Sequence, residues 1–326
     1  MFDGEELLES SIRVIRHCVE HVVVVYQTVS NFGNPCRKGL ERLLQVLVDR
    51  GIVNEIVHYD PSVEISVEEK RELVAADANP DDIGGSVEAV GEQFFHELRK
   101  REMGRRRCQA AGCSHFMSMD TDEFYLPEQL ERAKEMCATG GYDVTACRMR
   151  LYFKAPYYEY LPVDSVNAVT LICRLDDAMP LRLVAGRYPV LVDPTRRTTG
   201  WGSFHLFERA DVEMHHYSFV RLDISSKLAN VSNKGNYRAD LRAFLQQFEA
   251  WKPSHGVLHP HPNIGKQFTH VQVRDDPFNI HLDLICSFCC ALSVHRCSRC
   301  KSAVYCSLEC QHLDWSFHSI SCLQEK

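Results

Sequence analysis

Short apolar runs alternate with helical spacings along the first part of the chain. Residues 21–27 form an apolar run that predicts a buried strand, residues 37–49 carry leucines on one helical face, and residues 52–58 predict a second strand. A strand–helix–strand start is typical of α/β domains with right-handed crossovers. The fold class that we predict is therefore α/β, built on a doubly wound sheet.

The same patterning continues over most of the chain. It predicts helices over 86–111, 126–137 and 237–251, and strands over 142–153, 168–175 and 211–219. Residues 62–90 are predicted to form a loop with one short helix. Residues 252–266 contain three prolines and three histidines and are predicted to form a second loop.

Composition and charge exclude several classes of protein. With 326 residues, 45% of them apolar, the chain is long enough for one large domain and a small one. A net charge of −7 argues against binding to nucleic acid or to membrane surfaces. No run approaches the roughly 18–20 apolar residues of a membrane span, and the acidic N-terminus lacks the features of a secretory signal. We therefore expect a cytoplasmic or nuclear protein.

The cysteines divide the chain into two parts. Without a secretory signal, fifteen cysteines indicate metal binding and free thiols rather than disulfides. Eight of the fifteen fall between residues 286 and 322, which marks that segment as a separate module. We predict one domain over 12–280 and a zinc module over 284–326, and we expect zinc removal to unfold only the module.

An acidic stretch ends the apolar run near the middle of the chain. Residues 115–125 read HFMSMDTDEFY, and on a continuing strand Asp120 and Asp122 would share one face. Two carboxylates at the carboxyl end of a strand suit a hard divalent cation. The alternative is an acidic loop that caps the helix starting near Pro127.

Three segments together resemble a GT-A-type glycosyltransferase of the family-2-like kind. They are residues 25–33 (VYQTVSNFG), 112–125, which include the Asp-x-Asp, and 214–221 (MHHYSFVR). The resemblance covers residues 12–280 and implies a Rossmann-like nucleotide-diphospho-sugar transferase fold. It implies a nucleotide-sugar donor, an unknown acceptor, and Mn or Mg that offsets charge on the leaving diphosphate.

The same resemblance assigns roles to individual residues. It implies a divalent metal held by Asp120, by Asp122 as the main ligand, and by His216 rather than His215. The implied donor-binding residues are Gln27, Ser30, Asn31, Asp60, Lys100, Arg101, Asp120, Arg221 and Lys227. Asp122 is assigned a catalytic role through the metal, and Asp211 and Glu213 are candidate bases, with Glu208 as a competitor. The basic run that contains Lys100 and Arg101 also fits a solvated helix face or a nuclear-localisation patch.

The cysteine-rich tail is the most specific signal in the sequence. Its spacing is Cys-x2-Cys-x7-Cys-x2-Cys-x5-Cys-x3-Cys-x7-His-x3-Cys over residues 286–322. Zinc takes four tetrahedral thiolate or imidazole ligands, and close pairs supply two from one turn. Eight ligands therefore predict two zinc ions in a segment too short to fold on an apolar core alone.

Over its whole length the tail resembles a MYND-type zinc finger. The resemblance implies interleaved sites, with one zinc bound by Cys286, Cys289, Cys306 and Cys310, and the other by Cys297, Cys300, His318 and Cys322. It also implies that the finger recognises a short peptide motif, often containing proline, in a protein partner. Cys290 lies outside the pattern and is predicted to be a spare thiol.

Two functional hypotheses follow. The first is a metal-dependent glycosyltransferase whose finger recruits a partner or substrate. The second is a catalytically inactive GT-A-like fold that acts as a zinc-finger adaptor. A MYND-containing SET lysine methyltransferase is excluded because no SET segment is recognisable.

Overall fold

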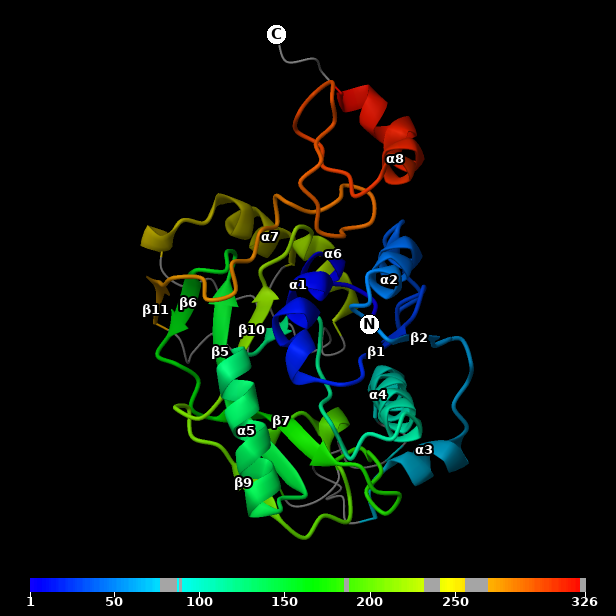
Figure 1. The fold of residues 1–326 in the computed structure, drawn as a ribbon, viewed down its shortest axis with the longest axis vertical. Helices are drawn as coiled ribbons and strands as arrows, with labels where there is room; N and C mark the ends of the chain where they lie inside the picture. Colours follow the sequence, from blue (N-terminus) through cyan, green and yellow to red (C-terminus); the bar gives the residue numbers. More distant parts are fainter. Residues whose placement is uncertain (77–86, 88–89, 185–187, 232–240, 256–268, 323–326) are drawn as a thin grey trace.

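The computed structural model describes residues 1–76, 87, 90–184, 188–231, 241–255 and 269–322. It has a mixed α/β body with a small module at its C-terminal end (Figure 1). Parts of the predicted loops at 62–90 and 252–266, the start of the helix predicted over 237–251, and the last four residues of the predicted zinc module lie outside the described residues.

The strands form two sheets. β1 (Val23–Tyr26) and β2 (Glu55–His58) are a parallel pair joined through α2 (Leu40–Asp49), as the strand–helix–strand pattern predicted. The larger sheet is centred on β5 (Val144–Phe153), which pairs in parallel with β10 (Glu213–Phe219) and antiparallel with β7 (Asn167–Arg174). Its other strands are β3 (His115–Phe116), β4 (Glu123–Phe124), β6 (Tyr158–Leu161), β8 (Leu191–Val192), β9 (Phe204–Leu206) and β11 (His270–Val273).

This mixed pairing corrects the expectation of a doubly wound parallel sheet. Only β1 and β2 are joined by a helical crossover of the expected kind. β6 folds back antiparallel on β5, and β3, β4 and β11 each pair antiparallel with their neighbours. The described strands therefore support an α/β class but not the doubly wound arrangement.

The helices surround these sheets (Figure 1). They are α1 (Glu5–Ile15), α2, α3 (Val67–Leu73), α4 (Glu92–Ala110), α5 (Pro127–Gly140), α6 (Ile224–Asn230), α7 (Leu241–Ala250) and α8 (Leu308–Ser321), with short 3-10 turns at Arg16–Cys18, Pro194–Arg196 and Pro253–His255. α5 begins with a proline in its first turn and ends at Gly141 in the left-handed conformation, as helix-terminus chemistry favours. No helix in the described part of the chain is long and apolar enough to cross a membrane.

α1 was not predicted, and it starts before the proposed domain boundary at residue 12. Leu7 and Leu8 on this helix are buried in the body of the protein. The strand predicted to carry the two aspartates is also shorter than expected. β3 ends at Phe116, and Asp122 lies in a turn before β4.

The C-terminal module packs against α1 and α2. One apolar cluster joins Leu8 of α1 and Leu43 of α2 to Cys286, Tyr305 and other buried residues of the module. Figure 1 shows the module, coloured orange to red, next to α2. The body and the module therefore share part of their core.

Candidate functional site

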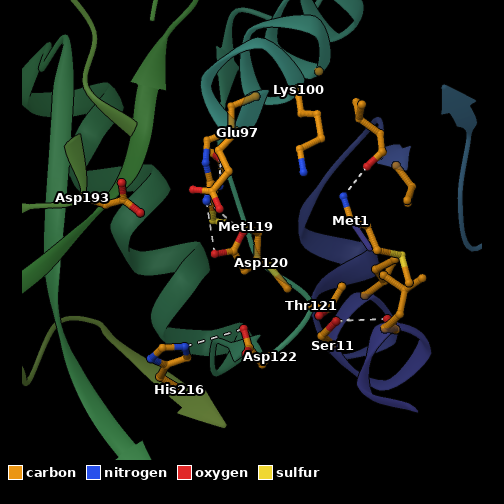
Figure 2. A pocket seen from close by; sticks show the side chains of 18 of the residues that line it. Met1, Ser11, Glu97, Lys100, Met119, Asp120, Thr121, Asp122, Asp193 and His216 are labelled. Atoms are coloured by element: carbon orange, nitrogen blue, oxygen red, sulfur yellow. Dashed lines mark hydrogen bonds and ion pairs between the residues drawn. The ribbon is translucent and has the colours of Figure 1, made fainter. Parts of the chain in front are cut away.

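A cavity of about 780 Å³ brings together most of the predicted donor-binding residues. Its walls come from α1, β1, α4, α6, β10 and the turn after β3, and Figure 2 shows Lys100, Asp120, Asp122 and His216 around it. The predicted residues that line it are Gln27, Ser30, Asn31, Lys100, Arg101, Asp120, Asp122, His216, Arg221 and Lys227.

Asp122 is buried in a basic environment. Its Oδ2 accepts hydrogen bonds from Arg221 and from Lys227 Nζ, the latter at 3.3 Å, and His216 Nε2 lies 3.7 Å from Oδ1. Burial alone would raise the pKa of Asp122, but the charges of Lys227 and Arg221 outweigh burial and hold the pKa well below its usual value. Asp122 is therefore a carboxylate that is already paired with cations.

Asp120 lies nearer the surface and pairs with other arginines. Its Oδ2 is 2.5 Å from Arg196 Nη2, and Arg101 Nη2 donates to it at 3.2 Å. Burial raises the pKa of Asp120, but Arg101 and Arg196 lower it further and keep the group ionised. Arg196 also donates to Glu123, at 2.7 Å to Oε1 and 2.9 Å to Oε2.

Sequence reasoning missed Arg196 and Glu123. Arg196 arrives from the 3-10 turn at Pro194–Arg196, more than seventy residues after the carboxylates that it binds. No local pattern around it marks this long-range contact.

This arrangement does not support a divalent metal at the two aspartates. Asp120 and Asp122 point to different basic partners, because a turn replaces the predicted strand. In the described part of the chain, clusters of three or more potential ligands within 4.8 Å occur only in the C-terminal module. Mn or Mg would have to displace Arg221 or Lys227 from Asp122.

Two polar residues in the loop after β1 take part in local hydrogen bonds. Ser30 Oγ accepts hydrogen bonds from the backbone N–H groups of Phe32 and Asn34, and so holds the turn. Gln27 Nε2 donates to Asn31 Oδ1 at 3.2 Å, while Gln27 Oε1 is buried with no hydrogen-bond donor among the described residues. Gln27 therefore offers an open acceptor beside the cavity.

Asp60, Asp211 and Glu213 do not line the cavity. Asp60 is exposed and accepts a hydrogen bond from the Ser62 N–H in its own turn. Strand alternation directs Glu213 to the face of β10 opposite His216, where it pairs with Arg150 of β5 and with Arg209 in the turn before β10. The geometry gives no support to Asp211 or Glu213 as bases at this cavity.

The same alternation separates the two neighbouring histidines. His215 is buried, its Nδ1 lies 2.8 Å from Tyr152 Oη, and burial followed by the charge of Arg150 lowers its pKa to about 4. His215 is therefore a neutral core residue, and His216 is the one that reaches the cavity.

The first residues of the chain form another wall of the cavity that sequence reasoning missed. Thr121 Oγ1 donates to the Asp3 carbonyl at 3.2 Å, and the Leu222 N–H donates to Glu6 Oε1 at 3.1 Å. A Cβ added at Gly4, which has φ +83°, would lie 2.4 Å from Arg221 Nη1. The apolar residues of α1 at positions 7, 8, 12 and 15 were the available signal for this helix.

The C-terminal module brings its eight predicted ligands into two clusters. The clusters are Cys286, Cys289, Cys306 and Cys310, and Cys297, Cys300, His318 and Cys322. This outcome confirms the interleaved sets.

The spacing within each cluster suits zinc. Tetrahedral zinc with Zn–S bonds of about 2.3 Å places sulfur atoms about 3.8 Å apart. In the first cluster the Sγ atoms of Cys289, Cys306 and Cys310 are 3.4 to 3.8 Å apart. In the second, Cys300 Sγ lies 3.5 Å from His318 Nε2. The residues therefore fit two zinc ions.

Local backbone geometry prepares both sites. The residue after each Cys-x2-Cys pair, Cys290 or Lys301, adopts a positive φ and its N–H donates to the carbonyl of the first cysteine of that pair. Ser307 caps α8 by accepting a hydrogen bond from the Cys310 N–H at 3.1 Å. Cys290 is buried outside both clusters, in accord with its prediction as a spare thiol.

Comparison with known proteins identifies this module. Residues 286–322 match the family model described as the MYND finger. Residues 286–322 are a MYND zinc finger. The finger is a protein-interaction module, and its two ligand sets are the ones the resemblance predicted.

The similarity to curated proteins is confined to a short segment. The N-lysine methyltransferase SMYD2 of Bos taurus and that of Sus scrofa are each 46% identical to this chain over 39 residues. That stretch is 11% of this chain and 9% of each relative, so the chain matches less than a tenth of their length. No solved structure matches the chain. The comparisons thus give no support to the GT-A resemblance of residues 12–280.

Proposed function

We propose that this protein is an adaptor whose MYND finger recruits a protein partner. The observation that carries the proposal is the pair of four-ligand clusters within the segment that matches the MYND model. Two zinc ions would hold this short segment rigid and preorganise its surface for binding.

An exposed apolar surface on α8 supports a binding role. Leu308 and Ile320 are 74% and 85% exposed, and Trp315 and Phe317 are also exposed on this helix. Exposed aromatic and aliphatic side chains on a small rigid module are typical of partner-binding modules.

Peptide binding tests the adaptor proposal. Fluorescence polarisation of the full, zinc-loaded chain against a library of short proline-containing peptides should find a binder. Trp315→Ala should weaken it by roughly 30-fold, the effect of losing about 2 kcal/mol at an aromatic anchor. Val166→Ala, at an exposed apolar residue far from the finger in sequence, serves as the control. A library without any binder, or equal affinities for both variants, would contradict the proposal.

The cavity favours a second candidate function, glycosyl transfer from a nucleotide-sugar donor. Lys100, Arg101, Arg221 and Lys227 line one cavity that is large enough for a nucleotide. Cations gathered in a partly buried cavity attract a diphosphate, and Gln27 offers an open acceptor to a base or ribose. In this arrangement the guanidinium and ammonium groups, rather than a metal, would offset the charge of the leaving diphosphate.

Nucleotide binding tests the second candidate. Nucleoside diphosphates should raise the melting temperature of the chain with and without Mn²⁺, because the binding groups are cationic side chains. Lys100→Gln should reduce that shift, whereas Arg106→Gln, at an exposed residue of the same helix, should leave it unchanged. A chain that binds no nucleoside diphosphate would remove this candidate and leave the adaptor function intact.

A further inference from the structure

The first zinc site of the finger lies against the large domain. Cys286, Cys289 and Cys310 belong to the same buried cluster as Leu43 and Leu44 of α2. A Cβ added at Gly39, the residue before α2, would lie 2.4 Å from the Phe288 carbonyl. The backbone between the first two zinc ligands therefore rests directly on the start of α2.

A buried carboxylate anchors this backbone. Glu9 is 1% exposed and accepts a hydrogen bond from the Leu292 N–H at 2.7 Å. Arg50 Nη1 donates to Glu9 at 2.8 Å and to the Leu292 carbonyl at 3.3 Å. Arg37 Nη2 donates to the Ser287 carbonyl at 3.0 Å. Residues of α1, the end of α2 and the loop before it thus hold both sides of the zinc-binding turn.

Arg42 of α2 pairs with the residue that precedes the zinc ligand Cys310. One of its guanidinium nitrogens lies 2.6 Å from Glu309 Oε2, next to Cys310. Its Nε is buried and has no hydrogen-bond acceptor in the described part of the chain. Glu309 directly precedes Cys310 in the chain, so Arg42 reaches the edge of this zinc site.

Charge explains why an arginine lies here. Zinc with four thiolates carries a net charge of about −2, and a buried charge is costly unless it is paired and hydrogen-bonded. Removing a side chain that hydrogen-bonds to a metal ligand commonly lowers the metal affinity by about 10–100-fold.

We propose that α2 completes the zinc site of Cys286, Cys289, Cys306 and Cys310, with Arg42 donating to the Cys310 thiolate from the large domain. Zinc at this site then stabilises the layer formed by α1, β1 and α2 as well as the finger. This assignment is independent of the partner and nucleotide proposals, because it concerns only the interface within the chain.

The interface also links zinc to the cavity. Leu8, Ile12 and Val24 belong to the cluster shared with the finger, and the same residues line the cavity. Loss of zinc is therefore expected to loosen α1 and α2, an outcome that differs from the expectation that only the tail unfolds.

Zinc competition against a chelating dye, with native mass spectrometry to count bound ions, tests the role of Arg42. Arg42→Gln should lower the zinc affinity of one of the two sites by about 10–100-fold and leave the affinity of the other site nearly unchanged. Arg42→Lys keeps the positive charge, so its zinc affinity should lie between those of wild type and Arg42→Gln. The matched control is Arg299→Gln, which removes the same charge from an exposed finger residue.

Hydrogen exchange on the full chain supplies a second readout. Removal of zinc from wild type should reduce protection of the α2 amides, and Arg42→Gln should reduce it at zinc concentrations at which Arg299→Gln does not. If Arg42→Gln does not fold, Arg42→Lys carries the comparison with Arg299→Gln. Equal zinc affinities for the arginine variants and the control, or unchanged α2 protection on zinc removal, would overturn the proposal.

Discussion

Replacement of Asp122 by asparagine should destabilise the whole chain, although Asp122 lies in a ligand cavity. Its side chain is 3% exposed and pairs with Arg221, whose side chain is 2% exposed. The asparagine would leave the Arg221 guanidinium buried without the carboxylate that it contacts, with only the more distant charges of Asp3, Glu5 and Glu6 nearby. Lys227 is 19% exposed and can turn its ammonium group towards water, so it adds less to the cost.

The expected loss follows from this burial. Removing one partner of a buried ion pair costs about 3–5 kcal/mol, because the other charge stays buried and unpaired. At about 2–4 °C for each kcal/mol, the melting temperature should fall by roughly 10 °C. The double variant Asp122→Asn/Arg221→Met removes the stranded cation and should recover part of the loss.

Urea denaturation followed by circular dichroism measures these differences. The pKa of Asp122 is depressed in the folded state, so its stabilisation is present above the ordinary aspartate pKa of about 3.9 and is lost as the pH falls through the folded value. The gap between wild type and Asp122→Asn should therefore stay constant from pH 8 to about 5 and narrow in stronger acid. Asp60→Asn, at an exposed aspartate, is the control. If Asp122→Asn is as stable as this control, the Arg221 pair is not the resident state of the cavity.

Three further outcomes are expected. Wild-type stability should fall as the pH drops from about 6.5 towards 4, because His215 is protonated in the unfolded chain but stays neutral when it is buried in the folded protein. His215→Asn, which can still hydrogen-bond Tyr152, should reduce this dependence of the unfolding free energy on pH in urea titrations. Ser307→Ala should lower the free energy of unfolding by about 1 kcal/mol, because α8 loses its N-cap. The same change removes the hydrogen bond to the Cys310 N–H and should lower the zinc affinity of one site in a chelator competition. Leu43→Ala should cost about 2–5 kcal/mol in urea denaturation, because Leu43 is fully buried.

Periodicity predicted the elements better than their pairing. The helices around α2 and α4 and the strands β5, β7 and β10 occur where apolar spacing placed them. The predicted parallel sheet failed because strand direction depends on contacts between distant segments, which apolar spacing does not encode. α1 is an element that periodicity could have predicted but that we missed. Its leucines and isoleucines lie on one helical face, but we used its acidic start only to argue against a secretory signal.

The zinc ligands were predictable because their chemistry is local. Each Cys-x2-Cys pair brings two thiolates together within one turn, so spacing alone marks the site. The cavity was predictable only in part. Asp122 and His216, both named from the sequence, line the same cavity. The sequence could not show that Arg221 pairs with Asp122 or Arg196 with Asp120, because these partners lie 99 and 76 residues apart in the chain.

The position of the finger constrains how the two candidate functions combine. α2 packs against the finger beside the first zinc site, so a partner must use the surface that stays exposed, which includes Ile320 of α8. β1 lies between the finger and the cavity. Val24 of β1 belongs to the apolar cluster shared with the finger, and both Val24 and Val25 line the cavity, together with residues of α4. A partner on α8 therefore leaves the cavity open. The proposed adaptor and ligand-binding functions are therefore compatible. Both would depend on zinc if, as we propose, zinc stabilises the wall between the finger and the cavity.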